Sequence, residues 1–316
     1  MINMKLPRVS IVIPAYNEEK DIGRLLDSLM KLNYPKKKLE IIVVDDGSID
    51  NTSKIVSKYS VRMIKGPHKG VGVARNFGWR SAKSDIIIFI DADVVVHKNF
   101  VKEMIKYYKD PKIAGVNNRE ILLNKKNLIA RLSYLRKILA LNYVKFRILR
   151  TCKKSILKQV GGFDPDYGFY DDWELTMRIV KLGYKVIYAP KAIVWHKEPE
   201  TWKELYRQSI WTGRSMLFSF KGYKKEAIRR VLFSLLCASL PVYIIFSFLS
   251  LPFQILGIVG LILFSFIEFK RSLEIFLIIK RKESFFTPFF DFISMLLVCF
   301  GMFDGLLHIK QKSIKA

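Results

Sequence analysis

The stretch Ile86-Ile-Ile-Phe-Ile-Asp91-Ala-Asp93 decides how the rest of this 316-residue chain is interpreted. Its run of apolar, mostly β-branched residues is typical of a strand that is buried on both faces of a parallel sheet. In open α/β sheets, ligands bind beyond the carboxyl ends of the strands, so this strand would place Asp91 and Asp93 at that position. Two carboxylates there suit a divalent cation, Mg²⁺ or Mn²⁺, that carries phosphate oxygens. The alternative is that they only cap the following turn.

Strands and helices alternate around this stretch over the first two thirds of the chain. Apolar runs predict strands at 9–14, 39–44, 61–64, 185–189 and 193–196, and helical spacing predicts helices at 22–32, 52–59, 74–81, 99–108 and 169–183. This alternation is typical of βαβ units. We therefore expect an α/β fold with a Rossmann-like, mostly parallel sheet.

The formal net charge of the chain is +26. Most of it lies before residue 229, because the part from Arg229 onward has 10 Lys and Arg against 5 Asp and Glu, a net of +5. A basic body suits the anionic cytoplasmic face of a membrane, and nucleic acid is the competing partner. We expect no nucleic acid partner, since the basic residues are scattered and the sequence has no nucleic-acid-binding motif.

The three cysteines, Cys152, Cys237 and Cys299, form neither a metal-binding nor a disulfide pattern. Two of them lie in apolar runs and are interpreted as small hydrophobic residues. The N-terminus leads directly into a predicted strand, so we expect no signal peptide. These features predict a reducing compartment, with the basic body of the chain in the cytoplasm.

The composition becomes apolar near the C-terminus, which predicts a domain at 1–228 followed by a membrane region at 229–316. Residues 231–251 are long enough to span a bilayer, 253–267 form a shorter second run, and 268–283 are expected at the interface. Residues 285–307 are a third candidate, interrupted by Asp291 and Asp304, and are predicted to be either a re-entrant or in-plane helix, or a span packed against the others. The positive-inside rule places the body, the basic loop at 280–282 and the tail in the cytoplasm. The alternative is a buried helical bundle in a soluble protein.

Two further helices, at about 128–149 and 202–220, carry many basic and aromatic residues. We expect them to be amphipathic and to lie near the membrane or over the site. An ordinary surface helix is the alternative for the first of them.

Polar side chains follow several of the predicted strands. Pro14, Tyr16 and Glu18 follow the first strand, Asp45-Asp46-Gly47-Ser48 follows the second, and a glycine-rich loop at 66–72 precedes Arg75. Strand-end loops with carboxylates, a glycine loop and an arginine suit a nucleoside diphosphate with a metal ion.

The order and spacing of these motifs, together with Asp171-Asp172-Trp173-Glu174, resembles glycosyltransferase family 2, the inverting nucleotide-sugar enzymes with a GT-A fold. The resemblance covers about residues 9–213. It implies a UDP- or GDP-sugar as the donor. It also implies nucleotide-binding roles for six residues, namely Pro14, Tyr16 and Glu18 in the pocket, Asp46 at the base or ribose, Arg75 at the diphosphate, and Asp91 at the ribose or metal.

The resemblance further implies that Asp93, with Asp91, ligates Mn²⁺ or Mg²⁺, and that His196 supplies another ligand. A lone histidine is also frequently structural. Asp172 takes the second position of the family's acidic pair and would be the general base, which Asp171 would help by raising its pKa. Its alternative role is a helix N-cap.

The expected acceptor is a hydroxyl of a lipid-linked or cell-surface glycan. Possible contacts to the acceptor are Arg119, Trp173, Arg207 and Arg214. A polyprenyl-phosphate acceptor, or a non-catalytic nucleotide-sugar-binding scaffold, are the alternatives. The sequence Gln208-Ser-Ile-Trp211 lacks the arginine of the Gln-x-x-Arg-Trp motif of processive synthases in this family, so we expect transfer of a single sugar.

Overall fold

The structure is a computed structural model, and it describes residues 6–143, 148–216, 228, 231–239, 251–279 and 282–314. The chain forms two compact units, one of residues 1–123 and 146–197, the other of residues 124–145 and 198–316. These units divide the chain at other points than residue 229, where the sequence predicted a domain boundary. That boundary stays a prediction about domain organisation.

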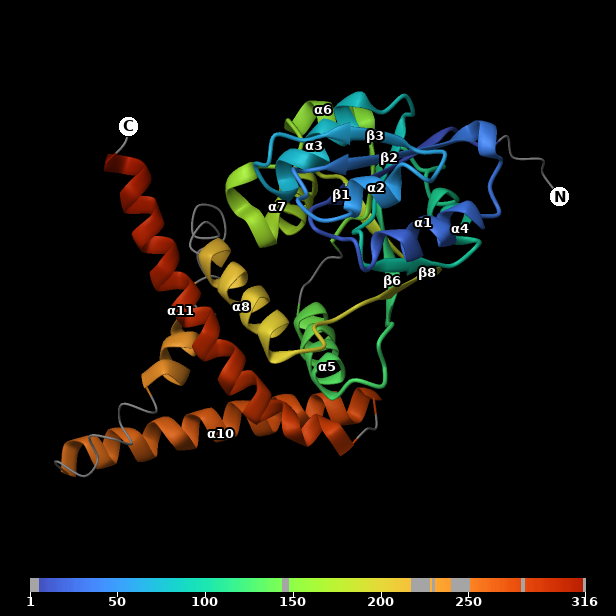
Figure 1. Ribbon diagram of the computed structural model, residues 1–316. Coiled ribbons are helices and arrows are strands. Elements are labelled where there is room, and N and C mark those ends of the chain that lie inside the picture. The colour runs from blue at the N-terminus through green and yellow to red at the C-terminus, as the bar shows by residue number, and fades with distance from the viewer. Residues whose placement is uncertain are drawn as a thin grey trace. The chain divides into compact units, whose positions relative to one another are not determined.

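The first unit is built on a mixed sheet with the strand order β3-β2-β1-β4-β7-β6-β8-β5 (Figure 1). Its strands are β1 Val9–Ala15, β2 Leu39–Asp45, β3 Arg62–Lys65, β4 Ile86–Phe89, β5 Val94–Val96, β6 Ile113–Leu122, β7 Thr151–Lys153 and β8 Lys185–His196. Four pairs are parallel, and only the pairs that involve β7 or β5 are antiparallel among the strands described. The predicted α/β class with a mostly parallel sheet is confirmed.

Helices cover both faces of this sheet, which explains why the central strand β4 is apolar throughout. The helical elements are α1 Ile22–Met30, η1 Lys36–Lys38, α2 Thr52–Val56, α3 Val71–Ser81, α4 Phe100–Ile105, α6 Lys154–Val160, η2 Pro165–Tyr170 and α7 Asp171–Lys181. In β4, Ile86 and Ile88 enter the core beneath α1 and α4, whereas Ile87 and Phe89 enter the core beneath α3, α6 and α7. Both sets are removed from water, so every residue of β4 is apolar.

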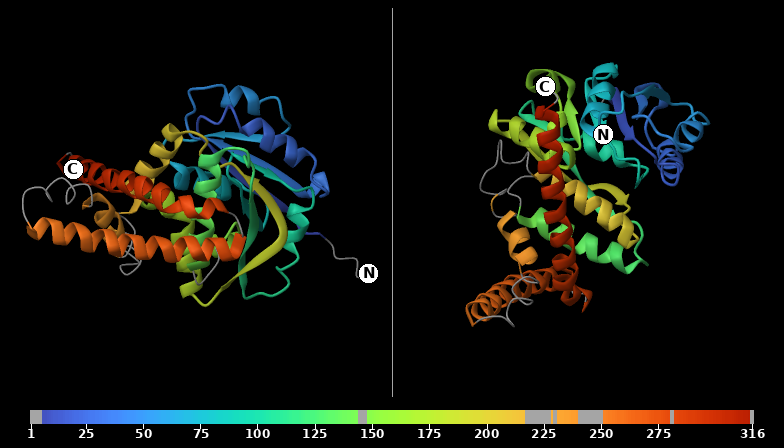
Figure 2. Two further views of the ribbon diagram at one scale, coloured as in Figure 1. Left: turned by 90° about the horizontal axis from the view of Figure 1, so that it is seen from below. Right: turned by 60° about the vertical axis from the view of Figure 1, so that its left-hand side comes forward.

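The sequence did not predict β5, β6, β7 or α6, because two of these strands have three residues and β6 contains the polar run Asn117-Asn118-Arg119-Glu120. The strands expected at 185–189 and 193–196 are one strand, β8, which curves along β6 with a register shift opposite Asn118 and Arg119 (Figure 2). Of the helix expected at 128–149, the structure describes α5 as far as Tyr143, residues 144–147 lie outside the described residues, and residues 148–150 are not helical and lead into β7.

The second unit is helical, with α5 Leu128–Tyr143, α8 Trp202–Met216, α10 Leu251–Ile279, η4 Lys282–Phe286 and α11 Thr287–Ile314, and residues 231–239 are also helical. In this unit α8 and α11 lie side by side (Figures 1 and 2). A Cβ added at Gly213 would lie 2.1 Å from the carbonyl oxygen of Val298, and one at Gly301 would lie 2.4 Å from that of Ile210. The two glycines therefore allow the backbones of α8 and α11 to touch.

The acidic residues of α11 are paired with arginines of neighbouring helices within this unit. The Asp291 side chain is fully buried and forms ion pairs with Arg136 of α5 at 2.6 Å and with Arg271 of α10 at 3.0 Å, and Asp304 forms one with Arg214 of α8. Glu283–Leu306 is long and apolar enough to cross a membrane, by length and composition. The choice between a re-entrant or in-plane helix and a packed span for residues 285–307 stays a prediction.

The other apolar segments of the C-terminal part are described in part. Residues 253–267 and most of 268–283, expected as two segments, belong to one helix, α10, whose first turn contains Pro252. Proline is tolerated there because the first turn of a helix needs no backbone N–H donor. The expected span at 231–251 lies mostly outside the described residues, as does the end of the helix expected at 202–220.

Candidate active site

The carboxylate of Asp91, two residues beyond β4, is held by two arginines. The Arg75 guanidinium lies 2.7 Å from it and the Arg150 guanidinium 3.4 Å from it. Burial opposes ionisation of this carboxyl, but the charges of the two arginines outweigh burial and hold the pKa of Asp91 well below its ordinary value. Asp91 is therefore an anion at the carboxyl end of the central strand.

Arg75 reaches Asp91 because α3 packs closely on β1. A Cβ at Gly78 would lie 2.2 Å from a methyl group of Val12, so only glycine allows this approach. The side chain of Asn76 donates to the carbonyl oxygen of Phe163 at 2.7 Å and accepts from its N–H at 2.9 Å. These bonds join α3 to the turn that precedes α7, and they bring the N-terminus of α7 beside Arg75.

Asp171 and Asp172, in the first turn of α7, bind different arginines. Asp171 is buried and lies 2.5 Å from Arg75, whereas Asp172 lies 3.1 Å from Arg150. Burial raises the pKa of Asp171 to about 6, with the Arg75 charge opposing the shift and the charge of Asp172 adding to it. The acidic pair is thus divided between a buried member and a member that is more accessible.

Arg75 is a buried cation shared by Asp91 and Asp171, so its loss leaves the buried Asp171 without its ion-pair partner and Asp91 with Arg150 alone. We expect Arg75→Gln to lower the free energy of unfolding by about 3–5 kcal/mol, as when one partner of a buried ion pair is removed. Urea unfolding checks this, with Arg80→Gln, an exposed position on the same helix, as the control. Equal stability of the two variants would contradict the prediction.

Asp93 lies beside His196 because β5 pairs with β8, in a register that sets Val94 opposite His196. The His196 Nε2 is 3.5 Å from Asp93 Oδ1. Among the described residues no group of three His, Cys, Asp or Glu side chains forms a complete metal site. One carboxylate and one imidazole fit a Mn²⁺ ion that takes its other ligands from a diphosphate, so the donor chemistry suits the expected ion.

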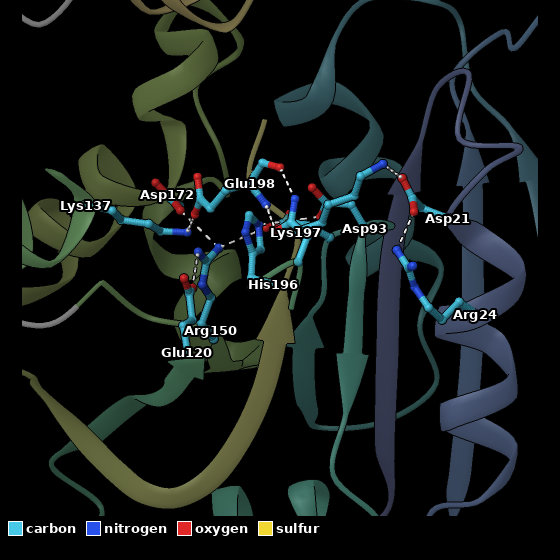
Figure 3. A network of polar contacts seen from close by, with 12 residues as sticks. Asp21, Arg24, Asp93, Glu120, Lys137, Arg150, Asp172, His196, Lys197 and Glu198 are labelled. Carbon is cyan, nitrogen blue, oxygen red and sulfur yellow. Dashed lines mark hydrogen bonds and ion pairs between the residues drawn. The ribbon is translucent and has the colours of Figure 1, made fainter. Parts of the chain in front are cut away.

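Figure 3 shows Asp172, Arg150, His196 and Asp93 next to one another at the edge of the sheet. Asp172 is linked through Arg150 to Asp91, and the charge of His196 also acts on Asp91. The residues expected to hold the metal ion and to act as the base therefore lie in one cluster of the first unit.

Glu18, after β1, is close to the same carboxylates. Burial, and then the charges of Asp93, Asp21 and Asp91, raise the pKa of Glu18 from 4.5 to about 8. The carboxyl group is thus protonated at neutral pH in the folded protein, in the absence of a cation.

This raised pKa makes stability depend on pH. Between about pH 4.5 and 8 the unfolded chain has released the Glu18 proton and the folded protein has not, so stability falls as the pH rises through this window. We expect Glu18→Gln to remove this part of the fall. Thermal melting in metal-free buffer from pH 5 to 8 checks this, with Glu19→Gln as the control. The prediction is wrong if the wild type and Glu18→Gln lose stability in parallel.

The nucleotide-binding motifs lie on neighbouring loops. Asp46 accepts hydrogen bonds from the N–H groups of Lys69 at 3.3 Å and Gly70 at 2.8 Å, so it holds the glycine-rich loop. The exposed ring of Tyr16 lies 4.7 Å from that of His68. Pro14 is buried in β1. The contacts of Asp46 with the loop were not predicted, and its role at a base or ribose stays a prediction.

The residues considered for the acceptor are distributed over both units. In the first unit Arg119 is exposed on β6 and Trp173 is partly buried on α7. In the second unit Arg207 is exposed on α8, and Arg214 forms an ion pair with Asp304. Their roles stay predictions, and Arg214 already has a partner within its own unit.

Sequence reasoning missed Arg150, Glu120 and His68. Arg150 stands in a basic stretch without a motif, and it reaches the cluster only because β7 lies between β4 and β6. Its guanidinium also lies 3.2 Å from Glu120 of β6. His68 lies in the glycine-rich loop, and its positive φ of 54° is a feature that sequence does not reveal.

Known proteins resemble this chain over most of its length. The sequence profile described as "Glycosyl transferase family 2" matches residues 10–163. The probable glycosyltransferase YdaM of Bacillus subtilis is 30% identical, over 97% of this chain and 85% of that protein. The poly-β-1,6-N-acetyl-D-glucosamine synthase of Staphylococcus aureus is 27% identical, and the match covers 78% of this chain and 65% of the length of the synthase.

A solved structure has the same fold. The mannosyltransferase PcManGT from Pyrobaculum calidifontis, in complex with GDP-Man and Mn²⁺, superposes with a TM-score of 0.67 and covers 95% of this chain and 88% of its own. Its sequence identity is 19%, so this likeness concerns the fold alone. The chain therefore belongs to glycosyltransferase family 2 and is a glycosyltransferase with the GT-A fold.

Proposed function

We propose that this glycosyltransferase moves one sugar from a UDP- or GDP-sugar to a hydroxyl of a lipid-linked or cell-surface glycan, with inversion at the anomeric carbon. The observation that carries the proposal is the connected cluster in which Asp172 and Asp91 share Arg150 while Asp93 lies beside His196. It provides a possible base and a possible metal pair in one place. The mannosyltransferase with the same fold was solved with GDP-Man and Mn²⁺, which supports such a donor.

In this mechanism, the oxygen of the acceptor hydroxyl forms a bond to the anomeric carbon while Asp172 takes the proton of that hydroxyl. The bond from that carbon to the phosphate oxygen breaks, and its electron pair leaves with the nucleoside diphosphate. A divalent cation held by Asp93 and His196 would neutralise charge on the diphosphate. Arg75 is occupied by Asp91 and Asp171, so we propose that it supports the diphosphate site mainly by fixing Asp91.

The donor is tested with UDP-glucose, GDP-mannose and TDP-glucose, each with Mn²⁺ and with a membrane lipid extract as the source of acceptor. We expect release of nucleoside diphosphate from at least one donor, and loss of this release when EDTA removes the metal. Analysis of the product gives the acceptor and its anomeric configuration. A protein that turns over none of a broad panel of nucleotide sugars would contradict the proposed function.

We also propose that the chain works at a membrane, with its catalytic unit on the cytoplasmic side. The support is the apolar stretch Glu283–Leu306, the exposed apolar side chains along α10 and the net charge of +26. The purified protein should float with vesicles that contain anionic lipid. Ile262→Asp, at an exposed position of α10, should weaken flotation, and equal recovery with and without vesicles would contradict the proposal.

A further inference from the structure

The backbone of Arg150 is hydrogen-bonded to two strands. Its N–H donates to the carbonyl oxygen of Val116 in β6 at 2.9 Å, and its own carbonyl oxygen accepts from the N–H of Phe89 in β4 at 2.8 Å. Its side chain is 15% exposed. Arg150 thus directly precedes β7, and its backbone is hydrogen-bonded to the strands on both sides, which suits a residue that orients other groups.

The two terminal nitrogens of this guanidinium bind different carboxylates. Nη1 donates to Asp172 Oδ2 at 3.1 Å and to Asp91 Oδ2 at 3.4 Å, and Nη2 donates to Glu120 Oε1 at 3.2 Å. The Asp172 side chain keeps 18% of its surface exposed. Its other oxygen, Oδ1, accepts no hydrogen bond from any residue that the structure describes.

We propose that Arg150 is a positioning residue, which holds Oδ2 of Asp172 so that Oδ1 faces the acceptor hydroxyl. This rests on the proposed function, in which Asp172 is the base. A bond to one carboxylate oxygen restricts rotation of the group and leaves the second oxygen to take a proton. The same nitrogen also donates to Asp91, so the distance between the base and the donor side of the site is set by one rigid group.

A purely structural role for Arg150, as a counter-charge for buried acids, is the alternative. In that case the removal of any one of its carboxylate partners would have a similar effect, and activity would fall only where the protein unfolds. Glu120 distinguishes the two roles, because it contacts Arg150 but neither Asp172 nor Asp91 in the contacts described. Glu120→Gln should therefore change the rate much less than Arg150→Gln, although both remove an ion pair of the same guanidinium.

The test measures the release of nucleoside diphosphate with the donor that the wild-type protein turns over fastest. Arg150→Gln is expected to lower kcat about 100-fold, the loss typical of a misplaced catalytic group. Arg150→Lys, which keeps the positive charge but loses the planar pair of guanidinium donors, should have a kcat between that of Arg150→Gln and that of the wild type. Arg150→Ala should regain rate when guanidinium chloride is added well below denaturing concentrations. A structural role predicts no such recovery.

A double variant shows whether Arg150 acts through Asp172. Because two residues that act as a unit are not additive, Arg150→Gln combined with Asp172→Asn should be no slower than Asp172→Asn alone. Additive losses, or wild-type kcat in a folded Arg150→Gln protein, would overturn the inference while leaving the proposed function intact. A wild-type protein without turnover would instead overturn the proposed function. Circular dichroism and the melting temperature of each variant exclude unfolding as the cause.

Discussion

Replacement of Asp172 by Asn is expected to lower the rate of sugar transfer to a hydroxyl acceptor by about 10³-fold, within the range typical of general base catalysis. The amide has nearly the shape of the carboxylate but cannot take the acceptor proton. It still offers Arg150 an oxygen, so the surrounding cluster should persist and the donor should still bind. Measurement of kcat and of the donor KM separates the two effects, and we expect the loss to lie in kcat.

Asp166→Asn is the matched control for this variant, because Asp166 is exposed in the segment that precedes α7. It should retain the wild-type rate. The outcome also distinguishes the two acceptor classes, since a lipid phosphate is already ionised and needs no base. A folded Asp172→Asn protein with nearly full activity toward a polyprenyl phosphate would exclude the hydroxyl mechanism and favour the phosphate one.

Replacement of Asp93 by Ala is expected to abolish metal-dependent turnover, with a loss of more than about 10³-fold, because the charge on the departing diphosphate is no longer neutralised. Asp93 lies 3.5 Å from His196, and without this carboxylate the remaining imidazole is a poor site for Mn²⁺, which prefers oxygen ligands. Nucleoside diphosphate release with increasing Mn²⁺ measures the effect on activity.

Mn²⁺ binding in the presence of UDP or GDP, followed by electron paramagnetic resonance, provides a second measurement that does not depend on turnover. Asp93→Ala should weaken binding. Asp85→Asn, exposed just before the opposite end of β4, should leave binding and rate unchanged. Wild-type affinity for Mn²⁺ in the Asp93→Ala protein would show that the ion is held elsewhere.

The local pattern of apolar residues in the sequence was sufficient to predict the first half of the sheet. The strands β1, β2 and β4 and the helices between them follow from apolar runs and helical spacing, since the strands are buried on both faces and the helices on one. The positions of Asp91 and Asp93 beyond β4 follow in the same way, because they depend only on where that strand ends. Motif order was then enough to indicate the family, which the comparisons confirm.

The second half of the sheet could not be predicted in this way, because it depends on pairing between strands that are far apart in the sequence. The short strand β7 contributes little apolar area of its own and is stable only between β4 and β6. Its insertion brings Arg150 to Asp91 and Asp172, a contact that no local signal predicts. The pairing of β5 with β8 likewise brings His196 to Asp93.

The α/β class, the strand ends that carry the acidic residues, and the enzyme family all follow from local patterns in the sequence. The arginines that neutralise those acids are evident only in the folded chain, where Asp171 pairs with Arg75, Asp172 with Arg150, and Asp91 with both. The physical reason is that strand ends follow from local burial, whereas the partner of a charge depends on which distant segments the sheet brings together.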